Sequence, residues 1–312
     1  MNKSKGYLMF RLPIVMVLSL VSVMAFSALG ESSGNKGTLT ASKFHSPTLD
    51  EYINYNVYLP YGYAGSNKYP VIYMLHGRGD KMSAWTKVVD DMDNLIANGD
   101  IPPVIAIMPD APWCDRGNYY IDSEYKTGKK VETALVHDLT AHVDFAYSTI
   151  NSRDGRIIAG YSMGGYGAAR YLLAHPDIFG SGIVLSPAVY TPFPPIDSST
   201  REFGAFGRGE QKFVDEIWIA KNYPSAILVF EASKLTSKVY IAVGDKEWKN
   251  PPPDEMHDLD MEAHLMFNKV CRVKGVTVEF RVMDGGHDWD VWLPAFTDAM
   301  KYLFKQPVAK IK

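Results

Sequence analysis

Short, uninterrupted apolar runs recur along this chain after residue 69, and segments with helical patterning separate them. Such runs are typical of strands buried on both faces of a sheet. Their alternation with helices indicates an α/β fold with a mostly parallel central sheet and helices on both faces. The runs are residues 71–75, 104–108, 156–159, 182–185, 239–243 and 276–282, and the helical segments are residues 83–97, 131–150, 165–174 and 256–273, with a last one after His287.

Residues 45–305 form one predicted α/β domain, since neither an internal repeat nor a clear linker interrupts them. The alternating polar and apolar residues at 52–59 predict a half-buried strand at an antiparallel edge of the sheet. Residues 187–234 are long for a connection between two core strands, which suits a lid or a substrate-binding insertion, or a surface loop with helices and no role. Residues 306–312 are read as a C-terminal tail.

The first thirty residues have the layout of a signal peptide. Basic residues precede an apolar stretch at 12–26, and the small residues Ala28 and Gly30 follow it. We predict cleavage before Glu31, export to the periplasm or the medium, and no stable membrane insertion afterwards. The alternative is an uncleaved anchor, but the stretch is shorter than the ~20 residues that span a bilayer. Residues 31–44 are expected to be a flexible mature N-terminus and a first edge strand.

Charge and cysteine content exclude some classes of function. The formal net charge of −3 over 312 residues gives no overall attraction to nucleic acid or to anionic membranes. We therefore expect a small-molecule or carbohydrate substrate and no nucleic-acid partner. The cysteines are Cys114 and Cys271, so no disulfide framework holds the domain together, and whether they pair stays open.

The sequence GYSMG at residues 160–164 lies directly after the apolar run at 156–159 and directly before a helical segment. In this context the G-x-S-x-G pattern is typical of a nucleophile elbow, a tight strand-to-helix turn that exposes a Ser hydroxyl. We predict Ser162 as the nucleophile. The amide of Met163, at the start of the following helix, is the expected first donor to a developing oxyanion.

A Ser hydroxyl needs a base within hydrogen-bond reach, and an acid must orient that base. His287 follows the last predicted core strand, which makes it the predicted base. The acid is expected after the strand at 239–243, where Asp245 and Glu247 compete. The spacing from Gly244 favours Glu247, and Asp245 remains the alternative.

The second oxyanion donor is expected in the loop after the first core strand. His76 and Gly77 follow that strand, and we assign the donor to the amide of the next residue, Arg78. A metal site is the alternative to this serine chemistry. The spacing of His257, Asp258, Asp260 and His264 matches no ligand pattern, so no metal is predicted.

Further motifs accompany these candidates: LHG at 75–77, Trp85, MPD at 108–110, GYSMGGYGA at 160–168, HPD at 175–177 and GHD at 286–288. Together they resemble the esterase D and antigen-85-like branch of the α/β hydrolases, which includes feruloyl and tributyrin esterases and S-formylglutathione hydrolase. The resemblance covers roughly residues 45–305 and implies the α/β-hydrolase fold. It also implies ester hydrolysis through an acyl-enzyme without metal or organic cofactor, with Arg78 as the second oxyanion donor. Glu247 stands where many members carry Asp, which keeps Asp245 open.

Aromatic residues gather near the predicted catalytic loops, and they suggest feruloyl or other acyl esters of carbohydrates as substrates. Two alternatives remain beside the serine esterase. The same acyl-enzyme can pass its acyl group to a sugar hydroxyl, which would make the protein an acyltransferase. A hydrolase-fold protein can also lose catalysis and only bind carbohydrate. The residues expected to contact the substrate are Trp113, Tyr161, Trp248 and Trp289.

Overall fold

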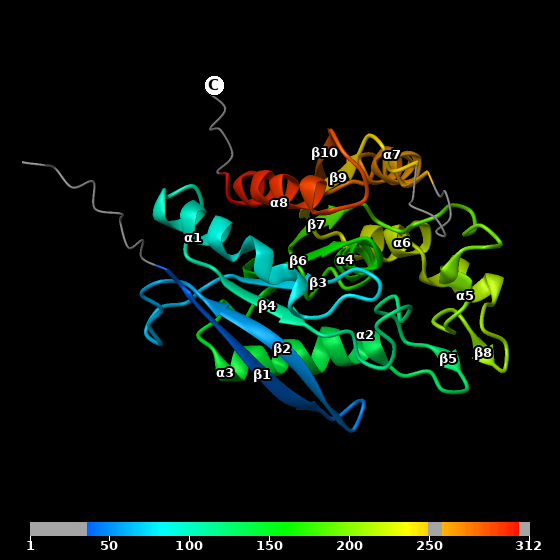
Figure 1. Ribbon diagram of the computed structural model, residues 1–312, viewed down its shortest axis with the longest axis horizontal. Helices are drawn as coiled ribbons and strands as arrows, with labels where there is room; N and C mark the ends of the chain where they lie inside the picture. Colours follow the sequence, from blue (N-terminus) through cyan, green and yellow to red (C-terminus); the bar gives the residue numbers. More distant parts are fainter. Residues whose placement is uncertain (1–35, 249–257, 306–312) are drawn as a thin grey trace, which may run out of the picture. The chain divides into compact units, whose positions relative to one another are not determined.

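An eight-stranded sheet carries the fold, with strand order β1-β2-β4-β3-β6-β7-β9-β10 (Figure 1). β1 and β4 pair antiparallel with β2, and all other neighbours are parallel. A separate two-stranded sheet joins β5 (Glu124–Tyr125) and β8 (Arg208–Gly209). The strands of the large sheet are β1 (Thr38–Ser46), β2 (Glu51–Leu59), β3 (Val71–Leu75), β4 (Ile105–Pro109), β6 (Arg156–Tyr161), β7 (Ser181–Leu185), β9 (Ser237–Gly244) and β10 (Val276–Met283).

The structure is a computed structural model that describes residues 36–248 and 258–305. The predicted signal peptide at 1–30 and the predicted tail at 306–312 lie outside the described residues. So do residues 31–35 and the first residues of the helix predicted at 256–273. Among the described residues, no helix has the length and apolar character needed to cross a membrane.

Helices cover both faces of the sheet. α1 and α8 share one apolar cluster with the sheet, and α3, α4, α6 and α7 pack into a second cluster on the other face (Figure 1). The α-helices are α1 (Val89–Ala97), α2 (Val131–Thr133), α3 (Thr140–Ala146), α4 (Met163–Ala174), α5 (Asp215–Lys221), α6 (Tyr223–Ser233), α7 (Leu259–Val270) and α8 (Trp289–Phe304). The short 3-10 helices are η1 (Ala84–Val88), η3 (Arg153–Gly155) and η4 (Ser199–Arg201), and η2 (Ala134–Leu139) is a π-helix.

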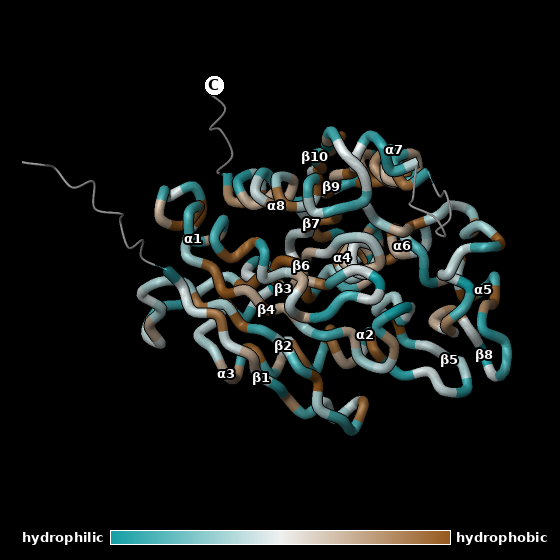
Figure 2. The backbone as a smooth tube through the Cα atoms, viewed as in Figure 1, coloured by the Kyte–Doolittle hydropathy of each residue, from teal (hydrophilic) through white to brown (hydrophobic). Residues whose placement is uncertain are grey.

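Side chains of one strand alternate between the two clusters because successive residues point to opposite faces. In β3, Val71, Tyr73 and Leu75 join the cluster of α4, whereas Ile72 and Met74 join that of α8. Hydrophobic colour follows the central strands in Figure 2. The predicted mostly parallel sheet with helices on both faces is confirmed, because strands buried on both faces require such unbroken apolar runs.

Two elements differ from the prediction. The run at 276–282 forms β10, which lies at the end of the described sheet beside β9. Its Val282 is 58 % exposed, so β10 is an edge strand and not a strand buried on both faces. The helix expected at 131–150 ends at Ala146. Tyr147 already has extended backbone, and Thr149 bridges to Tyr69 at the start of the sheet.

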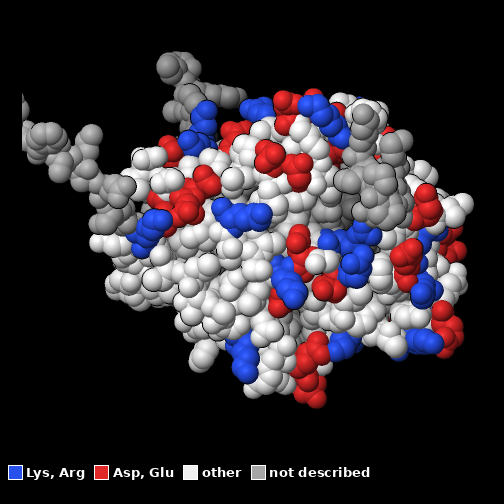
Figure 3. Space-filling model, in the orientation of Figure 1, with Lys and Arg blue, Asp and Glu red and all other residues white. Residues whose placement is uncertain are grey.

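Residues 187–234 combine a covering helix with a loop region. α6 packs on α4 in the manner of an ordinary crossover helix, and Asn222 caps its start. The turn at η4 contacts two loops that follow other strands: Ser199 accepts from the side chain of Arg78, and the hydroxyls of Thr200 and Tyr119 lie 2.5 Å apart. On the face shown in Figure 3, acidic and basic side chains are intermixed along the top and the right, and a broad area at the lower left carries few charges.

Candidate active site

Ser162 occupies a strained turn between β6 and α4. Its φ of 57° and ψ of −120° lie outside the regions that L-residues normally adopt. The turn packs so closely on neighbouring backbone that it requires glycine: a Cβ on Gly164 would lie 2.1 Å from the carbonyl O of Leu75. The N–H of Ser162 donates to the carbonyl O of Leu185 in β7 at 2.9 Å, which holds the turn against the sheet.

His287 links the serine to a buried carboxylate. Its Nε2 lies 2.9 Å from Oγ of Ser162, and its Nδ1 lies 2.8 Å from Oε2 of Glu247. The three residues come from the ends of β6, β9 and β10, where parallel strands bring their carboxyl ends to one edge of the sheet. The structure therefore brings together the nucleophile, base and acid predicted from the sequence.

Glu247 and Asp245 have different surroundings. The side chain of Glu247 is fully buried, and its Oε1 accepts from the N–H of Gly244 at 2.7 Å and from the hydroxyl of Ser186. Asp245 is exposed and accepts from the N–H of Gly285 at 3.0 Å. Of the two candidates for the acid, Glu247 is therefore the one that contacts His287.

The predicted oxyanion donors belong to segments that meet at Ser162. Met163 is the first residue of α4, so its N–H has no carbonyl partner within the helix. A Cβ on Gly77 would lie 3.4 Å from Cβ of Ser162, which places the loop that contains Arg78 against the nucleophile. The side chain of Arg78 turns toward the 187–234 segment, where it donates to Ser199.

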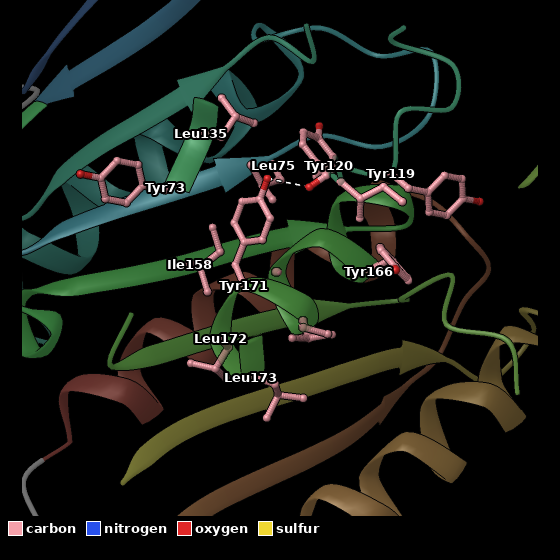
Figure 4. Close-up of a cluster of buried hydrophobic side chains, with 14 of the residues drawn as sticks. Tyr73, Leu75, Tyr119, Tyr120, Leu135, Ile158, Tyr166, Tyr171, Leu172 and Leu173 are labelled. Carbon is pink, nitrogen blue, oxygen red and sulfur yellow. Dashed lines mark hydrogen bonds between the residues drawn. The ribbon is translucent and has the colours of Figure 1, made fainter. Parts of the chain in front are cut away.

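Buried hydrogen bonds hold the loop after β3. Tyr120 donates its hydroxyl to the carbonyl O of His76 at 2.8 Å, and the hydroxyl of Tyr171 in α4 donates to the carbonyl O of Tyr120 at 2.8 Å (Figure 4). Tyr119 and Tyr120 both have positive φ, at 49° and 57°. Such backbone is costly for a bulky residue, and it persists here because both side chains are buried and hydrogen-bonded.

His76 braces the same loop from inside the protein. Its Nε2 accepts from the N–H of Ala111 at 3.1 Å, and its Nδ1 lies 2.8 Å from the carbonyl O of Gly77. Burial lowers the pKa of this imidazole, because the charged form loses its hydration. His76 is therefore neutral near pH 7 and donates from Nδ1.

The expected substrate-contacting aromatics lie in three different settings. The expectation for Tyr161 is corrected: its ring is 1 % exposed, stacks on Trp292 at 4.3 Å, and its hydroxyl donates to Asp80. Tyr161 points inward because it shares one face of β6 with Ile157 and Ala159. It supports the site and does not line it.

The remaining aromatic candidates are more accessible. Trp289 is half-buried against Tyr161 and Trp292, and Trp248 is 40 % exposed directly after Glu247. Trp113 has a positive φ of 72°. It lines a cavity of about 410 Å³ together with Asp80, Lys81, Asp110, Ala111 and Asp115.

That cavity adjoins the loop next to the nucleophile. The N–H of Gly79 donates to the carbonyl O of Asp115, and Asp80 accepts from Tyr161, the neighbour of Ser162. A second cavity, of about 810 Å³, lies at the opposite edge of the sheet, where β7, β9 and β10 begin, and it includes none of the triad residues. Within the described ranges, no group of three or more His, Cys, Asp or Glu side chains is arranged to hold a metal ion.

One residue beside the acid, Ser186, was not predicted from the sequence. Ser186 lies directly after β7, and its Oγ accepts from Nε1 of Trp292 at 2.9 Å. The ring of Trp292 in turn stands at 90° to that of His287, with centroids 5.0 Å apart. The signal for Ser186 was its place at the carboxyl end of the strand between those that supply Ser162 and Glu247.

Comparison with known proteins identifies the family of this chain. A family model described as "Putative esterase" matches residues 46–303. An endo-1,4-beta-xylanase/feruloyl esterase from Xylanibacter ruminicola is 32 % identical over 173 residues, which cover 51 % of this chain and 23 % of that protein. An uncharacterized Bacillus subtilis protein, YjcH, is 24 % identical over 276 residues, or 85 % of this chain and 97 % of that protein. The chain spans 23–27 % of the length of the first curated relatives it matches.

Solved structures of esterases have a similar fold. A ferulic acid esterase superposes with a TM-score of 0.70 at 25 % identity, over 86 % of this chain and 98 % of its own. An S-formylglutathione hydrolase from Agrobacterium tumefaciens has a TM-score of 0.67 at 17 % identity, over 86 % and 95 % of the two chains. These likenesses confirm the α/β-hydrolase fold expected from the sequence.

Proposed function

Because this chain belongs to the esterase family, in the branch that holds feruloyl esterases and S-formylglutathione hydrolases, we propose that it hydrolyses carboxylic esters through a covalent intermediate on Ser162. The observation that carries the proposal is the continuous path of hydrogen bonds from Ser162 through His287 to buried Glu247. Nucleophile, base and orienting acid stand in the order that acyl transfer requires.

In the acylation step, Nε2 of His287 accepts the hydroxyl proton of Ser162 while Oγ forms a bond to the ester carbonyl carbon. The carbonyl oxygen becomes an oxyanion, which the N–H groups of Met163 and Arg78 stabilise. The intermediate then breaks its bond to the alcohol oxygen. His287 returns the proton to that oxygen, the alcohol leaves, and an acyl-serine remains.

Deacylation repeats the sequence with water as the nucleophile. His287 takes a proton from water, whose oxygen forms a bond to the acyl carbon, and returns that proton to Oγ of Ser162 as the acid leaves. Glu247 keeps its charge throughout, since it orients Nδ1–H of His287 and stabilises the imidazolium form without taking its proton. Every step uses side chains and amides of the chain itself.

For the substrate class we propose feruloyl or other acyl esters of carbohydrates. The names of two relatives support this class, since both are described as feruloyl or ferulic acid esterases. The cavity lined by Trp113 adds support, because it adjoins the Arg78 loop and combines an aromatic face with carboxylates that accept hydrogen bonds from sugar hydroxyls.

The test compares wild type with Ser162→Ala on p-nitrophenyl acetate, p-nitrophenyl butyrate and methyl ferulate. We expect turnover by wild type and a loss of several orders of magnitude in the variant. Ser152→Ala is the matched control, because Ser152 is exposed and outside the site. Equal activity of Ser162→Ala and wild type would rule out the proposed mechanism. Acylated sugar formed when a sugar acceptor is added would instead identify the protein as an acyltransferase.

We also propose that the protein is exported, on the strength of the basic, apolar and small-residue segments within residues 1–30. Expression of the whole chain followed by cell fractionation and N-terminal sequencing tests this. Mature protein that begins at Glu31 in the periplasm or medium is expected, whereas a chain that keeps Met1 in the cytoplasm contradicts export.

A further inference from the structure

Ser186 lies behind the carboxylate that orients His287. It is fully buried directly after β7, and its backbone has the positive φ of 43°. Its N–H donates to the carbonyl O of Ala242 in β9 at 2.7 Å, which fixes the residue between the neighbouring strands. A non-glycine residue with this backbone is uncommon, and it is held here by both strands and by its side-chain contacts.

The hydroxyl of Ser186 stands between an indole and a carboxylate. Nε1 of Trp292 lies 2.9 Å from Oγ of Ser186, and Oγ lies 2.5 Å from Oε1 of Glu247. An indole N–H can only donate, so Oγ is the acceptor of that bond. The hydroxyl proton of Ser186 is therefore left for Glu247. The direction of both bonds follows from the chemistry of the groups.

The two oxygens of the Glu247 carboxylate have different hydrogen-bond partners. Oε1 accepts from Ser186 and from the N–H of Gly244, whereas Oε2 accepts from Nδ1 of His287. A buried carboxylate is stable as an anion only when such donors replace water. With Oε1 held by two donors, the carboxylate plane is fixed and Oε2 faces the imidazole.

We propose that Ser186 is a positioning residue for the triad: its hydroxyl, oriented by Trp292, fixes Glu247 so that Nδ1 of His287 keeps its proton and Nε2 stays free to accept the proton of Ser162. The inference rests on the proposed serine mechanism. Ser186 is fully buried and its hydroxyl bonds Glu247 and Trp292, so we expect its loss to lower kcat and leave KM close to the wild-type value.

The test measures kcat and KM for Ser186→Ala, Ser186→Gly and Trp292→Phe on p-nitrophenyl acetate. Glycine removes the hydroxyl while it suits the positive φ. We expect kcat to fall about 10- to 100-fold without the hydroxyl, as for the loss of a hydrogen bond to a charged group. Trp292→Phe keeps the packing of the ring and lowers kcat by a smaller factor. Ser181→Ala, at the start of the same strand, is the control and should match wild type.

Proton NMR separates a positioning role from a loss of stability. In a folded variant that is only less stable, the resonance of the Nδ1 proton of His287 should not change. Wild type should show a low-field resonance of the Nδ1 proton of His287, because that proton lies between Nδ1 and the Glu247 carboxylate. This resonance should move or broaden in Ser186→Ala and stay unchanged in Ser181→Ala. If Ser186→Ala does not fold, Ser186→Gly and Trp292→Phe give the same readouts.

The failures of the two proposals are distinguishable. Full activity in Ser162→Ala would overturn the serine mechanism itself. An inactive Ser162→Ala together with wild-type kcat in folded Ser186→Gly and Trp292→Phe would overturn only the positioning role. A raised KM with unchanged kcat in these variants would also overturn it, since that pattern indicates substrate contact.

Discussion

Ala111 determines which nitrogen of His76 carries the proton. Its N–H donates to Nε2, so the neutral ring donates from Nδ1 to the carbonyl O of Gly77. The carbonyl and N–H of one trans peptide point in opposite directions. The bond to Gly77 therefore fixes the direction of the N–H of Arg78, the proposed second donor to the oxyanion.

Replacing His76 by Ala should release this peptide. We expect kcat to fall about 10- to 100-fold, somewhat less than the ~10²–10³ that follows the loss of a whole oxyanion donor. Steady-state kinetics on p-nitrophenyl acetate measures the effect. His142→Ala is the control, because His142 packs against Phe44 and Tyr55 and takes no part in the site. Equal kcat in the two variants would contradict the role of His76.

The buried His76 should also make stability depend on pH. Its pKa is lowered in the folded protein, whereas an unfolded His titrates near pH ~6.5, so the unfolded chain binds the additional proton as pH falls. The free energy of unfolding therefore falls below pH ~6.5, by at most about 1.4 kcal/mol per pH unit for this one group. Urea unfolding at several pH values should show a smaller decline in His76→Gln. Parallel curves for the two proteins would refute this.

Arg78 allows the backbone donor to be separated from the side chain. Arg78→Ala keeps the amide and removes the side chain with its bond to Ser199, so we expect less than a tenfold loss of kcat. Arg78→Pro removes the N–H itself, and kcat should fall by about 10²–10³. Circular dichroism checks that both variants fold. If the two variants lose equal activity, the donor is not the amide of Arg78.

Glu132 forms a buried ion pair with Arg170 of the nucleophile helix α4. Burial opposes its charge, but hydrogen bonds and charge from His175 and Arg170 prevail and hold its pKa at about 2. Glu132→Gln should cost about 3–5 kcal/mol of unfolding free energy near pH 7, because Arg170 loses its partner. This stabilisation is present above pH ~4.5 and is lost as pH falls toward 2. Denaturant unfolding of Glu132→Leu/Arg170→Met should show a smaller loss than Glu132→Gln, and a larger one would contradict the account.

Gly164 tests the close packing of the elbow. An added Cβ would lie 2.1 Å from the carbonyl O of Leu75, so Gly164→Ala must displace backbone and should lower the free energy of unfolding by about 1–3 kcal/mol or more. Gly65→Ala is the matched control, since its Cβ would meet nothing closer than 3.9 Å. A thermal melt distinguishes the two variants, and equal melting temperatures would show that the elbow can relax.

Much of the fold could be predicted because strands buried on both faces leave a sequence signal that does not depend on distant contacts. The strand β10 was misread although its sequence carries a signal: Thr277, Glu279 and Arg281 alternate with apolar residues, which is the pattern of a half-buried strand and not of a central one. Its place at the end of the strand order agrees with that pattern. The early end of the helix after Ala146, in contrast, depends on the bridge from Thr149 to Tyr69, which joins residues far apart in sequence.

The candidate site could be predicted as far as chemistry requires particular residue types at strand ends. Ser162, His287 and an acid near 245–247 followed from that rule. The spacing from Gly244 favoured Glu247 over Asp245, and the structure places Glu247 against His287. Tyr161 was misread even though the alternation in β6 contains the answer, since it shares a face with Ile157 and Ala159. Ser186 was missed because a lone Ser after a strand has no motif.

The sequence separation within the triad has a consequence for how activity arises during folding. Ser162 and His287 lie 125 positions apart, and Trp292, which orients the Ser186 hydroxyl, comes later still, in α8. Contacts of such long range close late in folding, because the entropy of a large loop must be overcome first. A chain that is still emerging from the ribosome or only partly refolded thus carries an exposed elbow without a base. Under the proposed mechanism, ester turnover signals completed folding, and its time course during refolding should lag behind the recovery of secondary structure.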